Sequence, residues 1–305
     1  MQLHKDKERF HDAIMAASAK FGFEPALIEK DYFVTLFLKR ATERINGLVF
    51  KGGTSLSKCY KLIDRFSEDV DLTLDAEHFT QGRKRNSIKE LIAVCDDLEL
   101  ILLNREKIEL HTHGNFNRFE IQYPIKFQSD DVKSELIVEM TYIQKSYPSE
   151  ESEASSYIGD FLKEAGSSTI LAEYGLEPFC VQVQALQRTL IDKVFALCDY
   201  YLSGDTERNS RHIYDIAKLL TKVNAFDGTL QVLVSNVRND RKRNRTCLSA
   251  QDGVDVPEVL KSIINTEFFK KDYDETTLKL LSKPISYEDA IKSLQTVIDS
   301  EIFSI

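Results

Sequence analysis

The most constraining feature of this chain is a glycine pair that ends a short apolar run and opens a helical stretch. Gly52 and Gly53 follow Leu48-Val49-Phe50-Lys51, and the sequence continues Thr54-Ser55-Leu56-Ser57. At a turn from strand to helix, glycine lets backbone amides approach phosphate oxygens closely, and the helix N-terminus adds positive potential. We therefore expect Gly52, Gly53, Thr54 and Ser55 to cradle phosphates.

Two aspartates follow in a second apolar run, Asp69-Val70-Asp71-Leu72. Side chains alternate between the two faces of a strand, so Asp69 and Asp71 project from the same face. Neighbouring carboxylates repel each other unless a cation lies between them, and oxygen ligands favour a hard ion such as Mg²⁺, with Mn²⁺ as a substitute. A phosphate cradle beside metal-binding carboxylates predicts nucleotide chemistry.

A third carboxylate is expected, because metal-assisted transfer of a nucleotide usually needs more than two acids. The predicted strand Glu135-Leu136-Ile137-Val138-Glu139-Met140-Thr141 offers Glu135 and Glu139 on one face. Glu139 lies mid-strand between apolar neighbours, where a carboxylate is costly without a partner, so it is the better candidate. The sequence does not decide between the two.

Composition limits the alternatives. The chain has 305 residues and a net charge of −9, so a large nucleic-acid footprint is not expected. Local basic segments do occur, at Arg83-Lys84-Arg85 and from Arg238 to Arg245, and they fit either solvated surface or a small RNA-binding patch. No apolar run approaches the length of a membrane span, and no signal peptide is visible. Five scattered cysteines fit neither a disulfide framework nor a zinc site, so a cytoplasmic location is expected.

The order of predicted elements indicates an α+β fold with a helical second half. We expect a first domain over residues 1–150 and an α-helical domain over 151–305, with the boundary near 148–160 and the active-site cleft between them. The predicted elements, in chain order, are helices at 5–20 and 24–45, a strand at 48–50, a helix at 55–63, a strand at 68–74, a helix at 84–104, strands at 107–113, 117–127 and 135–143, and helices at 180–203, 207–222, 227–236, 256–270 and 286–302.

Two charged residues of the helical half lie beside apolar stripes. Lys193 borders the stripe Leu186, Leu190, Val194 and Leu197, and either extends outward to solvent or reaches into a cleft, where phosphates would be its partner. Asp215 either pairs with Arg211 one turn away on the helix surface or positions or deprotonates an incoming nucleophile. Spacing alone leaves both pairs of alternatives open.

Four blocks in order resemble the AbiEii/AbiGii toxin family of the DNA polymerase β-type nucleotidyltransferase superfamily. They are Ile28-Glu29-Lys30-Asp31-Tyr32, Phe50 to Lys58 together with Arg65 to Leu72, Leu190 to Leu197, and Arg211 to Ala217. The resemblance implies a mixed sheet flanked by helices, with Mg²⁺ on Asp69 and Asp71. It also implies a nucleotide-binding set of Gly52, Gly53, Thr54, Ser55, Ser57, Lys58 and Lys193, with Asp215 completing the catalytic group.

The same resemblance implies a function. Members of the family are toxins of abortive-infection, phage-defence type, paired with an antitoxin encoded beside them, and related members transfer nucleotides from an NTP to the acceptor end of tRNA. The expected activity is therefore Mg²⁺-dependent nucleotidyl transfer, with tRNA as the expected acceptor. Transfer to a protein hydroxyl or a small molecule, and a non-catalytic role in partner binding, remain the alternatives.

Overall fold

A computed structural model describes residues 2–67, 69–75, 78, 80–110, 114–129, 132–142 and 146–304. These residues form two compact units, of which the first contains Met1–Lys61 and Phe66–Val183. The second contains Leu62–Arg65 and Gln184–Ile305. The division therefore falls later in the chain than the boundary expected near 148–160, because a strand–helix–helix–strand segment after residue 148 completes the first unit.

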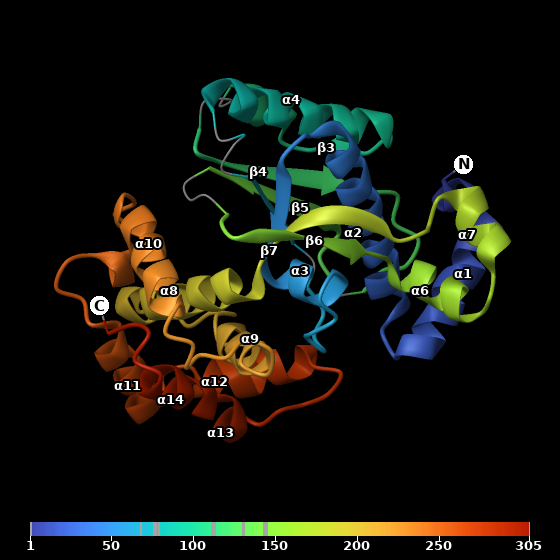
Figure 1. Cartoon of the computed structure of the whole chain (residues 1–305). Helices are drawn as coiled ribbons and strands as arrows, with labels where there is room; N and C mark the ends of the chain where they lie inside the picture. Colours follow the sequence, from blue (N-terminus) through green and yellow to red (C-terminus); the bar gives the residue numbers. More distant parts are fainter. Residues whose placement is uncertain are drawn as a thin grey trace. The chain divides into compact units, whose positions relative to one another are not determined.

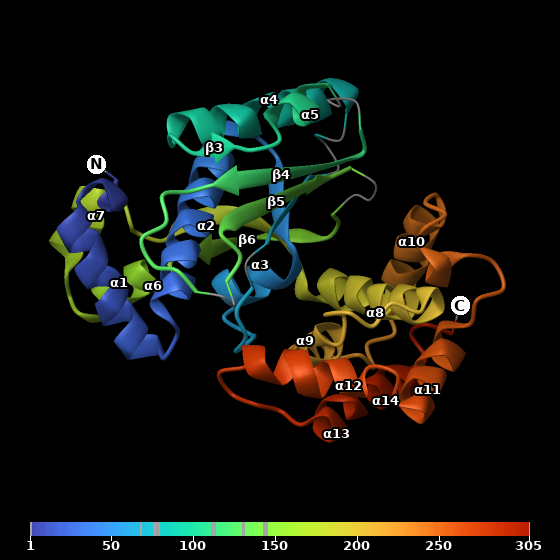
Figure 2. The ribbon, with the colours of Figure 1, turned by 180° about the vertical axis from the view of Figure 1, so that it is seen from behind.

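The first unit is built on one mixed sheet, in which the described residues supply seven strands in the order β3-β4-β5-β2-β1-β7-β6 (Figures 1 and 2). Strand β1 pairs antiparallel with β2 and parallel with β7, whereas β2 pairs parallel with β5. The strands are β1 (Leu48–Lys51), β2 (Val70–Leu74), β3 (Ile101–Leu102), β4 (Phe116–Gln122), β5 (Glu135–Thr141), β6 (Ser149–Ala154) and β7 (Phe179–Gln184). This sheet, followed by a helical second unit, confirms the predicted α+β class.

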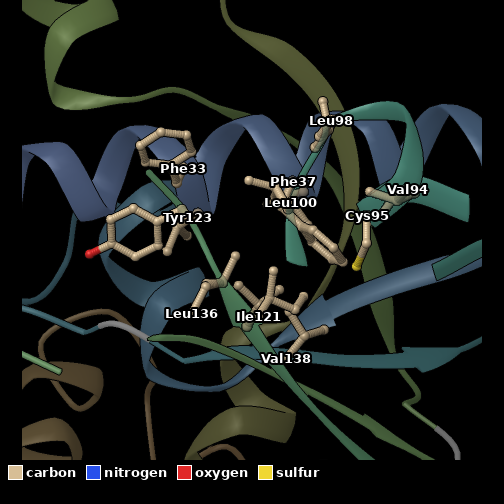
Figure 3. Packing of buried hydrophobic residues seen from close by; sticks show 14 of the residues in the cluster. Phe33, Phe37, Val94, Cys95, Leu98, Leu100, Ile121, Tyr123, Leu136 and Val138 are labelled. Atoms are coloured by element: carbon tan, nitrogen blue, oxygen red, sulfur yellow. The ribbon is translucent and has the colours of Figure 1, made fainter. Parts of the chain in front are cut away.

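Helices of the first unit supply its apolar core. They are α1 (Lys7–Phe21), α2 (Pro25–Arg44), α3 (Gly52–Lys58), α4 (Gln81–Asp97), α5 (Arg105–Leu110), α6 (Tyr157–Glu164) and α7 (Ser168–Tyr174), preceded by a 3₁₀ turn at Leu3–Lys5. Phe33 and Phe37 of α2 and Val94 of α4 pack on Leu136 and Val138 of β5 (Figure 3). Each such side chain contributes about 1.5–3 kcal/mol when fully buried. The apolar face of β5 is the one that its alternating sequence predicted.

The second unit is helical, and its longest helix, α8, packs against α9, α10 and α11. Leu190, Val194 and Leu197 of α8 are fully buried, as the stripe read from the sequence predicted, whereas Leu186 at its start is partly exposed. The helices are α8 (Leu186–Ser203), α9 (Arg211–Leu219), α10 (Leu230–Lys242), α11 (Val256–Thr266), α12 (Lys270–Asp272), α13 (Tyr287–Ala290) and α14 (Lys292–Asp299), with 3₁₀ turns at Leu248–Ala250 and Leu278–Leu280 and a π-helical turn at Tyr273–Thr277.

Several predicted elements were wrong. The strand expected at 107–113 is the helix α5 as far as Leu110, and residues 111–113 lie outside the described residues. The helix expected over 180–203 begins only at Leu186, because Val181 and Val183 alternate with polar residues and form the buried face of β7. The acidic passage after Pro148, where the domain boundary was expected, is the strand β6. Short strands are easily missed when they adjoin a long helical pattern.

Candidate active site

The acidic residues of the first unit lie side by side on neighbouring strands. Asp71 of β2 is directly opposite Glu139 of β5, and Asp69 precedes β2 by one residue. All three side chains are partly exposed. The parallel pairing of β2 with β5 therefore places Glu139, and not Glu135, opposite Asp71. Glu135 lies four residues away along the same strand, opposite Gln122.

Two basic residues extend this row across the sheet. Lys51, the last residue of β1, is opposite Asp71, and Arg118 of β4 is opposite Glu139. The Arg118 Nη1 donates to Glu139 Oε1 at 3.0 Å. Burial raises the pKa of Glu139, and the negative charges of Asp71 and Asp69 raise it further, whereas Arg118 and Lys51 oppose the shift. Glu139 therefore lies near enough to Asp71 and Asp69 to be affected by their charges.

The glycine turn lies directly against these acids. Strand β1 ends at Lys51, α3 begins at Gly52, and Gly52 has a φ of +75°. A Cβ atom at Gly52 would collide with the Asp71 carboxylate. Glycine is required here both by the left-handed backbone and by the space that Asp71 occupies. The predicted phosphate turn and the predicted metal-binding acid therefore form one site.

The hydroxyl groups of α3 hold the turn in place. Thr54 Oγ1 donates to the Asp69 carbonyl and lies 2.9 Å from Ser67 Oγ. Ser55 Oγ donates to the Gly52 carbonyl at 2.8 Å, and Ser57 Oγ donates to the Thr54 carbonyl at 3.0 Å. Thr54 and Ser55 are buried, whereas Gly52 and Ser57 are partly exposed. Contact between Thr54 or Ser55 and a phosphate is thus more readily made through the main chain than through these side chains.

Lys58 has a different environment from the one expected of a nucleotide ligand. Its ammonium is buried and lies 2.5 Å from Asp31 Oδ1 and 2.6 Å from Thr35 Oγ1 of α2. Burial lowers the pKa of Lys58, and Asp31 counters this shift. The resemblance grouped Lys58 with the nucleotide-binding residues, but its charge is already paired inside the first unit.

The fit of these acids to a metal ion is partial. Within the described ranges, no group of three or more His, Cys, Asp or Glu side chains is arranged to hold a metal ion. The available donors are carboxylate oxygens, the ligands that Mg²⁺ prefers, and Mg²⁺ is usually held by one or two carboxylates, with waters and substrate phosphates completing its shell. The acids therefore fit an open magnesium site that nucleotide phosphates would complete.

The second unit contains a separate buried cluster of charged groups. Asp215 of α9 is fully buried, and Arg65 Nε and Nη2 donate to its two oxygens at 2.7 and 2.8 Å. Lys193 Nζ of α8 lies 2.7 Å from Asp215 Oδ2. Lys193 and Asp215 are thus direct partners. The predictions that Lys193 extends to solvent and that Asp215 pairs with Arg211 on the helix surface were wrong.

The charges in this cluster decide its protonation state. Burial alone would raise the pKa of Asp215, but the Arg65 guanidinium and the Lys193 ammonium outweigh it and hold this pKa well below its usual range. Burial lowers the pKa of Lys193, the negative charge of Asp215 raises it, and the positive charge of Arg65 lowers it again. One carboxylate faces two cations, so the cluster carries a net positive charge.

Sequence reasoning gave no separate role to Arg65, Arg118 or Lys51. Arg65 was part of the motif before Asp69, but its partner in α9 is 150 residues away. Lys51 and Arg118 flank the acids only through strand register. The alternating pattern of β4 could have placed Arg118 on one face of its strand, but it could not have named the neighbouring strand.

Several basic side chains of the segment from Arg238 to Arg245 make contacts within the second unit. Arg238 Nη2 donates to the carbonyl of Val254 at 2.7 Å, and Arg241 Nη2 donates to Asp199 Oδ2 at 2.6 Å. Lys242 pairs with Asp252 at the surface. These contacts explain why arginines cluster there and leave less of the segment for nucleic acid.

The fold is that of a nucleotidyltransferase toxin. It is similar to MenT4 from Mycobacterium tuberculosis H37Rv, a nucleotidyltransferase toxin, at a TM-score of 0.55 and 17% identity, with 95% of this chain and 88% of that chain covered. The crystal structure of a putative nucleotidyltransferase from H. pylori matches at a TM-score of 0.45 and 16% identity over 90% of this chain and 96% of that one.

The chain belongs to the family of nucleotidyl transferase AbiEii toxins of type IV toxin–antitoxin systems, whose sequence profile matches residues 36–299. This confirms the resemblance read from the four sequence blocks. The family makes the chain an enzyme of nucleotidyl transfer, with an NTP as substrate and an antitoxin as partner. No match was found among curated proteins. Among the described residues, no helix is both long and apolar enough to span a bilayer.

Proposed function

We propose that this toxin is a Mg²⁺-dependent nucleotidyltransferase that adds a nucleotide from an NTP to the 3′ end of tRNA. The observation that carries the proposal is the contact between the glycine turn and the acids. Gly52 has room for no side chain beside Asp71, and Asp71 is opposite Glu139. A glycine turn at a helix N-terminus next to paired carboxylates suits a triphosphate accompanied by a divalent cation.

Asp69 and Asp71, with Glu139 as the third acid, are the residues that would hold Mg²⁺. When bound, the ion stabilises negative charge on the triphosphate oxygens. Gly52 is partly exposed at the turn, and Ser57 is the partly exposed hydroxyl of α3. Lys51, opposite Asp71, supplies a positive charge at the same edge of the turn.

The proposed reaction forms one bond and breaks one bond at the α-phosphorus. The acceptor 3′-hydroxyl oxygen bonds to this phosphorus, while the bond to the bridging oxygen of pyrophosphate breaks and the hydroxyl proton is released. Orientation of the two reactants supplies much of the rate enhancement in such transfers. The products are the lengthened acceptor and pyrophosphate.

For the second unit we propose that Lys193 binds nucleotide phosphate and that Asp215 positions Lys193. Asp215 has both oxygens engaged and a lowered pKa, so it is a poor proton acceptor near neutral pH. Arg65 and Asp215 fix the Lys193 ammonium at the end of a flexible side chain. This role differs from the ones expected from the sequence, in which Asp215 positions or deprotonates the incoming nucleophile.

One observation favours a different acceptor. The net charge is −9, and the arginines at 238 and 241 are engaged within the second unit. A protein hydroxyl or a small molecule needs fewer phosphate contacts than RNA does, so it is the second candidate. Incubation with each α-³²P-labelled NTP and either purified tRNA or an RNA-free lysate separates the two acceptors by where the label appears.

The test of the site compares two glutamates of one strand. We expect Glu139→Gln to abolish label transfer while leaving the unfolding midpoint unchanged, because it removes a carboxylate opposite Asp71. The control, Glu135→Gln, lies on the same face of β5 but opposite Gln122 and should retain activity. Full transfer by Glu139→Gln and by Asp71→Asn would refute the proposed site. A double Asp69→Asn/Asp71→Asn variant that still arrests growth would instead indicate a non-catalytic toxin.

A further inference from the structure

Three consecutive charged residues of α2 are buried in the first unit, and each is tied to a different segment. Glu29 accepts hydrogen bonds from the amides of Lys126 and Phe127, at 2.9–3.1 Å. Lys30 donates to the Lys133 carbonyl at 3.0 Å. Asp31 contacts Lys58 through Oδ1, and its Oδ2 accepts the Tyr157 amide at 2.8 Å. Buried charges at three successive positions call for an explanation beyond helix formation.

Asp31 reaches the helix that carries the glycine turn. Lys58 is the last residue of α3, and its ammonium is enclosed by Asp31 and Thr35 of α2. Asp31 and Lys58 are 5% and 4% exposed, so the pair is shielded from water. A charge pair in such surroundings is held firmly, because either charge alone would be left without compensation.

The opposite end of α3 contacts the acids. Thr54 Oγ1 donates to the Asp69 carbonyl, and Gly52 packs directly against the Asp71 carboxylate. The helix α3 is therefore fixed at its C-terminal end by Asp31 and connected at its N-terminal end to both aspartates. A shift of α3 would displace the phosphate turn and the two aspartates relative to each other.

We propose that Asp31 and Lys58 are positioning residues, and that their buried ion pair sets the geometry of the Gly52–Gly53 turn against Asp69 and Asp71. This inference rests on the proposed function, in that the turn is taken to bind the phosphates of an NTP. It gives Asp31 a role in the geometry of the phosphate turn, exerted through Lys58 and α3. It also assigns Lys58 a role that excludes contact with phosphate.

The space around Lys58 supports positioning over phosphate binding. The cavity lined by Asp31, Ser57, Lys58, Lys61 and Ser67 measures about 10 Å³. Such a volume admits about one water molecule and is too small for a phosphate group. For Lys58 to reach a nucleotide, its ammonium would have to leave Asp31 as a buried, uncompensated carboxylate.

A double-mutant cycle tests the proposal. Binding of ATP, GTP, CTP and UTP is measured by calorimetry for wild type, Asp31→Asn, Lys58→Met and the double variant, with Mg²⁺ present. Each single variant should weaken binding of the preferred NTP by about tenfold or more, because it leaves one buried charge unpaired and displaces α3. The double variant removes both charges and should recover to within about threefold of wild type. If the double variant binds as weakly as Lys58→Met, Lys58 contacts the nucleotide and the proposal is wrong.

Hydrogen exchange of the α3 amides gives a readout that does not depend on nucleotide binding. Both single variants should exchange faster in α3 than wild type, and the double variant should recover. Glu29→Gln is the matched control, since Glu29 is equally buried in α2 but holds the Lys126–Phe127 segment instead of α3. It should lower stability without changing NTP affinity or α3 exchange.

The two proposals fail in different ways. If the wild-type protein binds no NTP, the proposed function fails, and hydrogen exchange alone then decides the role of the pair. Unchanged α3 exchange in Asp31→Asn and Lys58→Met would overturn the inference, whatever the nucleotide result. A loss of NTP affinity in Glu29→Gln equal to that of Asp31→Asn would also overturn it, because general destabilisation would then explain both.

Discussion

The buried cluster of Arg65, Lys193 and Asp215 contains two cations and one carboxylate. Loss of the carboxylate should therefore destabilise the second unit more than loss of one cation. Removing Asp215 leaves two buried cations, whereas removing Arg65 leaves the neutral pair of Lys193 and Asp215 at 2.7 Å. Truncating one partner of a buried ion pair costs about 3–5 kcal/mol. We expect Asp215→Asn to lie at or above the upper end of that range.

Arg65→Met should cost less. Methionine retains much of the apolar volume, and Asp215 keeps one cationic partner, so the loss is mainly that of charge-assisted hydrogen bonds. The two bonds together are worth about 3–6 kcal/mol, but Lys193 keeps the Asp215 carboxylate compensated, so the net loss should lie below that of Asp215→Asn, which loses the same two bonds and leaves two cations uncompensated. The ordering, with Asp215→Asn more damaging than Arg65→Met, follows from the count of charges and not from the number of contacts removed.

The assay is urea unfolding at neutral pH, followed by circular dichroism and analysed through the midpoint and slope of the transition. The matched control is Lys218→Met, because Lys218 pairs with Asp64 at 2.8 Å but Asp64 keeps Lys283 as a second partner. Its loss should be about 0–1 kcal/mol. If Arg65→Met destabilises the second unit as much as Asp215→Asn does, the charge argument is refuted.

The same cluster predicts a pH dependence. The folded pKa of Asp215 lies below that of an unfolded aspartate, which is about 3.9. The stabilisation that Asp215 provides is therefore complete at neutral pH and is lost as the pH falls below about 4, where the unfolded carboxylate takes up a proton first. Asp215→Asn should show a shallower loss of stability in this acid range than wild type.

Two further predictions concern single residues. Gly52→Ala should abolish label transfer and lower the melting temperature, because it adds a Cβ atom at φ +75° against Asp71. Gly82→Ala in α4, where nothing lies within 4 Å of the added Cβ atom, should be harmless. Calorimetry and label transfer measure both variants, and an active Gly52→Ala would contradict the close approach of Gly52 to Asp71. Burial lowers the pKa of His212 well below its usual value, and the positive charges of Lys193 and Arg211 lower it further. The unfolded histidine therefore takes up a proton first, and the free energy of unfolding should fall as the pH drops below about 6.5, by up to about 1.4 kcal/mol per pH unit. His212→Gln should flatten this dependence between pH 6.5 and 5 in urea titrations, and an unchanged slope would show that the histidine protonates freely.

Local patterns predicted much of the first unit correctly. The apolar alternation of 135–141 gave the strand β5 and its buried face, and the glycine pair gave the end of β1. The helix expected at 55–63 begins earlier, at Gly52, and ends at Lys58. These features depend on residues that are neighbours along the chain. The strand β7 was missed because its short alternating run adjoins α8, whose longer helical period dominated the pattern.

The candidate site was predictable only in part. Sequence spacing placed Asp69 and Asp71 on one face, and the structure adds that Glu139 is the glutamate opposite Asp71. The role of Lys58 could not be predicted, because the residue that pairs with it, Asp31, lies 27 positions earlier in another helix. The place of Lys58 after a glycine turn indicated a phosphate ligand, whereas its contact with Asp31 indicates an internal ion pair.

What this sequence determined by itself is the chemistry available: a turn that only glycine permits, alternating carboxylates, and the family that shares them. Those follow from backbone preferences and from the two-residue period of a strand, which act over a few residues. Tertiary structure decided which charge meets which: Arg65 and Lys193 with Asp215, Asp31 with Lys58, and Arg118 with Glu139. A buried charge is stable only beside its counter-charge, and the position of that partner is set by packing between distant segments of the chain.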